Sequence, residues 1–392
     1  MEHRSRRGTG LFALTSAAVI GLSLVGAGTA VAGGGDGHGG GGSPPGTTTV
    51  VATGLDNPRQ LSFTAAGDLL VAEAGEGGSG PCFTGPEAGR VCFGTSGAVT
   101  RIDRRGNQSR VLTGLPSIAG EGSGAQAAGP SDVVGVGRSL SVLIGLGGNT
   151  DTRDALGAAG AQMGTLVQTS WNSHNLRTIA DLAAWEQAND PVAGPDGPDS
   201  NPVGLLYDCG RYLVADAGGN DVLTVSSRGT IRLFATFPEL TGTSPGPPPP
   251  NLPPAGTPIP VQPVPTSVAT KGYDGAYYVS QLTGFPFNKG LANIYRIDQR
   301  GRQTVYASGL TNVTDLAFNG RDLYAVQIAT EGLLNGPVGS VVQVPAGSTG
   351  PTPIAGGSGL FAPYGIALKD GNAYVTTNSV LANTGEVIRI KL

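Results

Sequence analysis

The chain has 392 residues, of which 13% are charged, and its formal net charge is −4. This weak acidity argues against a nucleic-acid partner, because binding to phosphates needs a basic face. A high content of Gly (66) and Pro (29) beside only 10 Phe, 10 Tyr and 2 Trp fits either a disordered chain or an all-β fold with many tight turns.

The N-terminal segment has the pattern of a signal peptide. A basic start with Arg6 and Arg7 precedes an apolar stretch, and Ala30-Val31-Ala32 forms a small-x-small cleavage site. We therefore predict a signal peptide at 1–32 and a secreted protein, either extracellular or periplasmic. The Arg pair leaves Sec and twin-arginine export both open. No later apolar run approaches ~18 residues, so we expect no membrane span after the signal is removed.

The next segment, 33–46, reads GGGDGHGGGGSPPG and is predicted to be a flexible tether. Beyond it, Cys82 and Cys92 flank one short loop, and an exported protein is expected to join them in a disulfide. Cys209 is left over in a turn-like context. No Cys/His cluster accompanies these residues, so a metal-site interpretation of the cysteines is disfavoured.

Internal similarity is the strongest pattern in the rest of the chain. Each repeat has an apolar strand, a turn with Gly or Asp, a second apolar strand and a polar residue. The segments are LSFTAAGDLLVAE (61–73), VVGVGRSLSVLIG (133–145, degenerate), LLYDCGRYLVAD (205–216), VATKGYDGAYYVSQ (268–281), LAFNGRDLYAVQ (316–327) and IALKDGNAYVTT (366–377). A second hairpin, such as ANIYRIDQRGRQTVYASGL (292–310), follows each one. Four-stranded units that recur every ~40–70 residues predict an all-β fold, a six-bladed β-propeller over 47–392.

The two ends of this region predict how the ring closes. The last repeat stops at GEVIRIKL (385–392) after its third strand, and the first begins with TTTVVATGL, which resembles fourth-strand text. Residues 47–53 should therefore complete the last blade and remove an open sheet edge. Two insertions interrupt the pattern: a helix is expected at about 178–188, and a proline-rich extended spacer at about 244–265.

Alignment of the repeats places equivalent polar residues around the mouth of the central channel, where propellers bind their ligands. The positions at the end of the second strand are Glu73, Gly145, Asp216, Gln281, Gln327 and Thr377. The positions at the start of the first strand are Gln60, Asp132, Gly204, Ser267, Asp315 and Gly365. From these sets the candidate ligand-binding residues are Gln60, Glu73, Asp132, Asp216, Gln281, Asp315 and Gln327.

The carboxylates in this ring allow two interpretations. Oxygen ligands of this kind suit calcium or magnesium, and a carboxylate pair can also do acid–base work. Alternatively, the acids cap strand ends and line a wet channel. The histidines are only His3, His38 and His174, so a Ser-His-Asp triad or a His-ligated zinc is disfavoured.

The loop QLTGFPFNKG (281–290) is a further candidate, because Phe285 and Phe287 alternate around a proline. One interpretation is a lip that grips an apolar or aromatic ligand. The other is a loop that packs its own aromatic rings against blade five.

At these residues the chain resembles the ScyD/ScyE family of secreted bacterial propellers. The resemblance rests on GLDNPRQL, LLVAEAG, GPCFTGPEAGRVCFGTSGAVTRID, VADAGGNDVL and VPTSVATKGYDGAYYVSQLTGFPFNKG, and runs from about residue 47 to the end. A more distant resemblance to calcium-dependent lactonases of the gluconolactonase type, and to NHL-like propellers, implies a metal site of one Glu, one Asp and two Asn. The nearest residues here are Glu73, Asn201, Asp216 and Asn220. Departures from the family text at Cys209 and in the proline-rich insert do not affect the ring.

Two functions follow as hypotheses. The preferred one is a secreted, non-catalytic module that binds a small molecule or an envelope partner, because Gly, Gln, Thr and Ser occupy most ring positions. The alternative is a calcium-dependent hydrolase of the lactonase type, with its site at the channel mouth. Whether the protein is an enzyme stays open, and calcium is the cofactor that the alternative would use.

Overall fold

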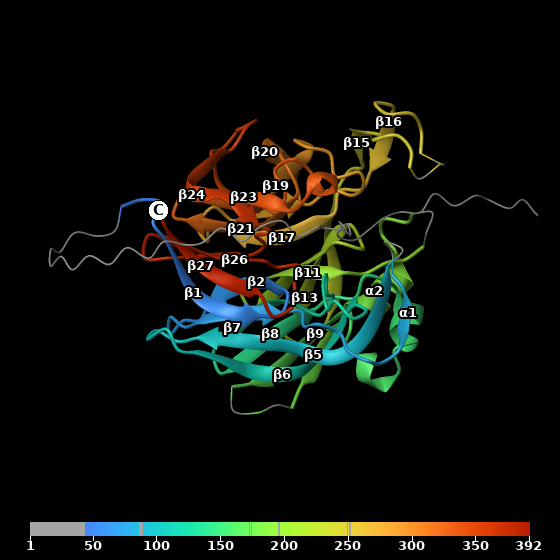
Figure 1. Cartoon of the computed structure of the whole chain (residues 1–392), viewed down its shortest axis with the longest axis vertical. Coiled ribbons are helices and arrows are strands. Elements are labelled where there is room, and N and C mark those ends of the chain that lie inside the picture. Colours follow the sequence, from blue (N-terminus) through green and yellow to red (C-terminus); the bar gives the residue numbers. More distant parts are fainter. Residues whose placement is uncertain are drawn as a thin grey trace, which may run out of the picture.

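The structure is a computed structural model that describes residues 44–392, except 86–88, 172, 174, 195–196, 249 and 251. Its strands form six small antiparallel sheets that are arranged as the blades of a ring (Figure 1). The predicted all-β, six-bladed β-propeller is confirmed. The signal peptide and most of the tether lie outside the described residues, as do His3, His38 and His174.

Each blade contains four consecutive strands, counted from the centre outward. Blade 1 consists of β2 (Pro58–Phe63), β3 (Leu69–Glu73), β5 (Arg90–Ile102) and β6 (Gln108–Gly120), with β4 (Cys82–Thr84) paired to β5. Blade 2 consists of β7 (Pro130–Val136), β8 (Ser139–Ile144), β9 (Thr165–Ser170) and β10 (Arg177–Asp181). Blade 3 consists of β11 (Pro202–Asp208), β12 (Arg211–Asp216), β13 (Asp221–Ser226) and β14 (Ile231–Thr236).

The second half of the ring repeats this order. Blade 4 consists of β17 (Pro265–Thr270), β18 (Ala276–Gln281), β19 (Ala292–Asp298) and β20 (Gln303–Leu310). Blade 5 consists of β21 (Val313–Asn319), β22 (Asp322–Gln327), β23 (Val338–Val344) and β24 (Thr352–Phe361). Blade 6 consists of β25 (Ile366–Lys369), β26 (Asn372–Thr377), β27 (Gly385–Lys391) and β1 (Thr48–Leu55).

The N-terminal strand closes the ring as predicted. β1 pairs antiparallel with β27, so that Thr48 lies opposite Ile390 and Leu55 lies opposite Gly385. Leu55 is fully buried. The last blade therefore takes its outer strand from the start of the propeller, and the closure joins the two ends of the ring without a gap.

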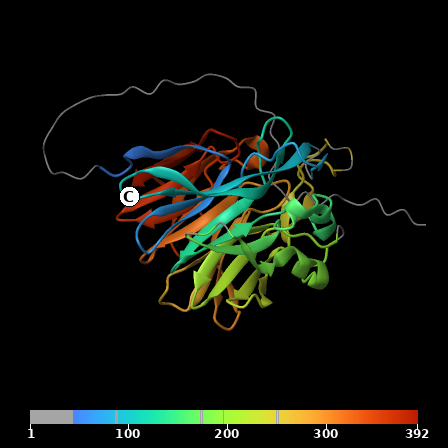
Figure 2. The same cartoon turned by 90° about the horizontal axis from the view of Figure 1, so that it is seen from below.

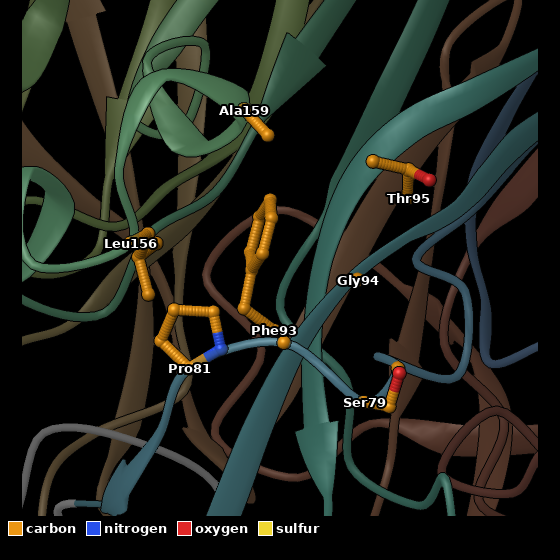
Figure 3. Close-up of a pocket in the computed structure, with 9 residues that line it drawn as sticks. Ser79, Pro81, Phe93, Gly94, Thr95, Leu156 and Ala159 are labelled. Atoms are coloured by element: carbon orange, nitrogen blue, oxygen red, sulfur yellow. The ribbon is translucent and has the colours of Figure 1, made fainter.

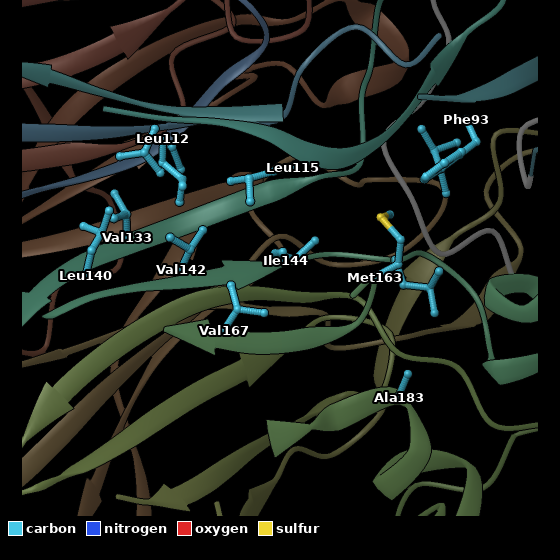
Figure 4. Packing of buried hydrophobic residues seen from close by; sticks show 14 of the residues in the cluster. Phe93, Leu112, Leu115, Val133, Leu140, Val142, Ile144, Met163, Val167 and Ala183 are labelled. Carbon is cyan, nitrogen blue, oxygen red and sulfur yellow. The ribbon is translucent and has the colours of Figure 1, made fainter. Parts of the chain in front are cut away.

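The core is divided among the interfaces between neighbouring blades. The apolar cluster in Figure 4 joins blades 1 and 2, with Leu112 and Leu115 from one blade facing Val133 and Val142 from the other. Corresponding clusters join blades 2 and 3, 3 and 4, 4 and 5, 5 and 6, and 6 and 1. Alternate residues along each strand supply them, because successive side chains of a strand point to opposite faces of its sheet.

The two ends of the blades differ in their connections. Long segments lie at one end, which we call the loop face; they are residues 74–89, 145–164, 182–201 and 237–264. Short turns such as 209–210 and 320–321 lie at the other end, which we call the turn face. In Figures 1 and 2 the helices α1 (Thr150–Asp154) and α2 (Leu182–Asn189) project at the end of the ring opposite the C-terminus.

The inserts take more definite structures than the sequence indicated. In the 178–188 segment, residues up to Asp181 belong to the outer strand β10, and the helix begins only at Leu182 because the side chain of Asp181 accepts the N–H of Ala184 as an N-cap. The proline-rich insert contains a hairpin of β15 (Leu240–Thr243) and β16 (Pro258–Val261). Single-turn helices η1 (Ala158–Gly160) and η2 (Leu333–Asn335) complete the loop face.

The cysteines behave as expected, since Cys82 and Cys92 form a disulfide and Cys209 is free and exposed. None of the helices in the described part of the chain is both long and apolar enough to cross a membrane.

Candidate functional site

The first-strand positions line the centre of the ring. Gln60, Asp132, Ser267 and Asp315 are all buried there. The amide of Gln60 reaches across from blade 1 and donates to two backbone carbonyl oxygens, at 3.0 Å to Thr266 of blade 4 and at 3.1 Å to Thr314 of blade 5. The predicted convergence therefore occurs for this set, inside the channel.

The two channel carboxylates hold neighbouring blades together. Asp132 of blade 2 accepts the N–H of Val133 at 2.7 Å and the N–H of Leu205, in blade 3, also at 2.7 Å. Asp315 of blade 5 has a richer set of donors: the hydroxyl of Ser267 at 2.7 Å, and the N–H groups of Leu316 and Ile366 at 2.8 Å. Each carboxylate thus spans at least one blade interface.

Burial decides the protonation of both groups. It raises the pKa of Asp315 to about 7, against the opposing effect of its three hydrogen-bond donors. Burial also raises the pKa of Asp132 well above its usual range, and the charge of Asp315 raises it further. Two acids that lie in one dry channel cannot both ionise without cost.

Glycine at the two remaining first-strand positions allows the blades to approach closely. A Cβ on Gly204 would lie 2.5 Å from the carbonyl oxygen of Thr266. A Cβ on Gly365 would lie 2.7 Å from the carbonyl oxygen of Arg59. These glycines are therefore packing residues and not gaps in a binding ring.

Arg59 and Tyr364 lie where the channel opens toward the loop face. The guanidinium of Arg59 is 4.9 Å from the centre of the Tyr364 ring, and it donates to the carbonyl oxygens of Ser379 and Ala127. Burial lowers the pKa of Arg59 and raises that of Tyr364. Both side chains are half-buried, so an incoming ligand would meet them first.

The second-strand positions have a different role from the one expected. Three of them accept a backbone N–H from the connection that leads into their own blade: Glu73 from Asp56 (2.8 Å), Asp216 from Asn201 (2.6 Å) and Gln327 from Thr311 (2.6 Å). Gln281 accepts instead from the N–H of Asn293. These side chains are buried and secure connections at the loop face.

Glu73 belongs to a separate ionic cluster at the junction of blades 6 and 1. Arg110 holds it from two sides, with its Nε 3.0 Å from one carboxylate oxygen and its Nη2 2.6 Å from the other. The same Nη2 contacts Asp56 at 2.7 Å, and Thr100 donates its hydroxyl to Glu73. No oxygen of Glu73 is left without a donor.

The four ligands implied by the lactonase resemblance are engaged in other bonds. The amide oxygen of Asn201 accepts the N–H of Leu146, and that of Asn220 accepts the N–H of Val264. Asp216 accepts from Ser200, Asn201, Gly218 and Gly219, while Glu73 binds Arg110. These four residues therefore do not fit a shared calcium ion in this arrangement.

Among the described residues, one trio of potential metal ligands converges, namely Cys82, Cys92 and Glu121. It carries no site, because the two sulfur atoms are joined in the disulfide.

Glu186 and Asp221 are buried acids that the sequence analysis did not select. Glu186 lies on α2 and Asp221 at the start of β13, and both are almost completely buried. Burial raises the pKa of Glu186 to about 9, with a further rise from Asp216, and it raises the pKa of Asp221 well above the usual range. The only sequence signal was an acid in the predicted helix, because the pair forms solely through tertiary packing.

The aromatic loop packs on its own blade neighbours. Phe287 is buried against Ile328 and Leu333 of blade 5, and the partly buried Phe285 lies beside it with the ring centres 6.3 Å apart. Of the two interpretations of this loop, this arrangement is the packing one.

A shallow pocket on the loop face lies between blades 1 and 2 (Figure 3). Its volume is about 440 Å³. Phe93 and Pro81 of the disulfide loop form one wall, and Leu156 and Ala159 from the α1–η1 segment form the other. The lining is apolar apart from Ser79, Thr95 and backbone atoms, so the pocket suits an apolar group and offers no titratable side chain.

No protein-family model and no curated protein matches the chain. Solved structures resemble it in fold. A structure provisionally described as a gluconolactonase has 10% identity and a TM-score of 0.47, covering 88% of this chain and 91% of that one. One provisionally described as a glucose dehydrogenase of Thermus thermophilus has 15% identity and a TM-score of 0.48, covering 88% and 99%. Virginiamycin B lyase from Staphylococcus aureus has 11% identity and a TM-score of 0.42, covering 88% and 99%. Likeness at this level says nothing about what the chain binds or does.

Proposed function

We propose that this chain is a secreted propeller of the ScyD/ScyE type that binds a ligand or an envelope partner through its loop face and catalyses no reaction in its channel. One observation carries the proposal: the channel carboxylates Asp132 and Asp315 are buried, and their oxygens accept hydrogen bonds from two or more blades. A catalytic or metal-binding carboxylate needs lone pairs directed at a substrate or an ion. Here those lone pairs fasten the ring.

The distribution of the connections supports the loop face as the binding surface. Binding residues of propellers and other rigid scaffolds concentrate on loops that the scaffold positions. The long segments, the pocket at Phe93 and the half-buried pair Arg59 and Tyr364 all lie at this end. The disulfide accords with export, as does the predicted signal peptide at 1–32.

A substrate screen tests the absence of channel chemistry. The purified chain would be assayed against lactones and esters with added calcium, beside an Asp132→Asn, Asp315→Asn double variant. We expect the two proteins to give the same background rate. Calcium-dependent turnover that the double variant loses would overturn the proposal and favour the hydrolase alternative.

A binding experiment tests the assignment of the face. The chain would be incubated with cell-envelope fractions of the source bacterium, and retention would be compared among surface variants. Ser79→Arg and Thr95→Arg alter exposed residues at the loop-face pocket, whereas Arg104→Glu alters an exposed turn-face residue. We expect the loop-face variants to reduce retention and the turn-face variant to leave it unchanged. The reverse pattern would show that the wrong face was chosen.

A further inference from the structure

The junction of blades 2 and 3 contains two buried carboxylates that lack compensation. Asp221 is 0% exposed, and neither of its carboxylate oxygens has a hydrogen-bond partner. Glu186 is 1% exposed, and its Oε1 also has no partner. Within the described part of the chain, no Lys or Arg forms an ion pair with either acid. A buried charge without a partner costs several kcal/mol, so these acids require a neutralising group.

The fold holds the two carboxylates against one another. Helix α2, which carries Glu186, is anchored at its start, where the N-cap Asp181 also binds Arg153. The loop before β13 passes so close that a Cβ on Gly219 would lie 2.9 Å from the carboxyl carbon of Glu186. The N–H groups of Gly218 and Gly219 do not serve these acids, because they point to Asp216. The backbone therefore brings the acids together and directs its nearest donors elsewhere.

We propose that Glu186 and Asp221 form a binding site for one hard divalent cation of the calcium class. The oxygens that are free in this junction are carboxylate oxygens, which are the ligands that such ions prefer. Calcium takes six to eight oxygen ligands, so carbonyl groups and water would complete the shell. Asp216 adds negative charge nearby, but its own oxygens are already bonded to Ser200, Asn201 and the glycine N–H groups.

This site differs from the one that the lactonase resemblance implies. It lies at a blade junction under α2, and not in the channel, and its ligands come from a helix and from the start of a third strand. A cation here would tie α2 to blade 3 and so order the loop face. Its role is structural and does not depend on whether the loop face binds a partner.

The test uses the full chain after treatment with chelator. Calcium would be titrated by calorimetry and thermal shift, and terbium luminescence would give an independent signal because Trp185 is adjacent to Glu186. We expect one ion per chain and a thermal midpoint that rises with calcium concentration, since an ion that binds only the folded state stabilises it. Absence of binding for calcium, magnesium and terbium up to millimolar concentrations would overturn the proposal.

Three variants locate the ion. Asp221→Asn and Glu186→Gln should each weaken calcium binding by more than about 100-fold, whereas Asp190→Asn, which removes a neighbouring charge but no ligand, should weaken it by less than about tenfold. In chelator, Asp221→Asn should melt at or above the wild-type midpoint because the amide removes repulsion; this shows that the variant is folded. Undiminished binding by Asp221→Asn would contradict the proposal. So would a midpoint indifferent to ions, because the acids would then share a proton.

Discussion

At the scale of single residues, position within a strand end decides whether a polar side chain fastens or binds. Glu73 has a glutamate in the place where other blades have Asp216 and Gln327, and all three accept a backbone N–H. Glu73 alone of these also carries an ion pair with an arginine. It is therefore a structural residue whose charge depends on Arg110.

Arg110→Ala should destabilise the fold by about 3 kcal/mol, because it leaves a fully buried carboxylate without its charge partner. Urea denaturation would measure the loss. The matched variant Arg110→Lys keeps the positive charge but not the two-pronged contact, so its loss should be smaller. If Arg110→Ala cost less than about 1 kcal/mol, the account of Glu73 as a charge held by Arg110 would be wrong.

Gly204→Ala should destabilise the ring by about 1–3 kcal/mol, because the new methyl group would lie 2.5 Å from the Thr266 carbonyl oxygen and force the blades apart. The control is Gly350→Ala, whose methyl group would meet no atom within 4 Å. Thermal unfolding of the two variants distinguishes close packing from a general effect of losing glycine. Equal midpoints would contradict the packing argument.

At the scale of elements, the closure of blade 6 by β1 converts a row of hairpins into a ring. β27 pairs with β26 on one side and with β1 on the other. Without β1, the N–H and C=O groups of β27 would form an exposed sheet edge, and edges of this kind promote aggregation.

A chain that begins at Asp56 should be less stable than one that begins at Pro44 by more than about 3 kcal/mol. Leu55 is fully buried, and residues of its size contribute about 2–5 kcal/mol to a core. Calorimetry would measure the difference. A synthetic peptide of residues 44–55 should restore part of the midpoint when added in excess. An unchanged midpoint in the shortened chain would mean that β1 does not support the ring.

At the scale of the whole molecule, the channel repeats a three-blade pattern. Blades 1 to 3 place Gln60, Asp132 and Gly204 at the first-strand position, and blades 4 to 6 place Ser267, Asp315 and Gly365 there. In each half the aspartate accepts the N–H of the residue that follows the glycine, Leu205 or Ile366. The ring is thus stapled twice, by the same device, on opposite sides of the channel.

This arrangement predicts that stability falls as the pH rises from 5.5 to 8 in the presence of chelator. The pKa of Asp315 is raised to about 7 and that of Asp132 is raised well above its usual range, so the folded state retains protons that the unfolded chain releases near pH 4. The stabilisation is complete below pH ~4 and is lost as the pH passes about 7. Nearby Arg59 and Tyr364 keep their charge states over this range.

Thermal midpoints in buffers from pH 5.5 to 8 would measure this dependence. Asp315→Asn removes one of the titrating groups, so its midpoint should change less steeply with pH than that of the wild type, whatever its absolute stability. A wild-type midpoint that rises across this range would contradict the prediction.

The sequence by itself determined the architecture. Repeated hairpins with turn residues specify six blades, the text at 47–53 specifies the closing strand, and the spacing of Cys82 and Cys92 specifies the disulfide. These features depend on local patterns that one chain displays directly. The set of positions that converges in the channel, Gln60, Asp132 and Asp315 included, was also readable from the alignment of repeats.

The tertiary structure alone decided which of the aligned positions face the channel. In blades 1 to 5 a register shift interrupts the start of the first strand, at or beside the channel residue. Such a bulge reverses the alternation of side chains, and it leaves no mark in a hydrophobic pattern. Equally, Glu186 and Asp221 meet only because α2 packs over the loop before β13. Long-range packing, which no single segment encodes, therefore created the acidic pair and placed Glu73 beside Arg110.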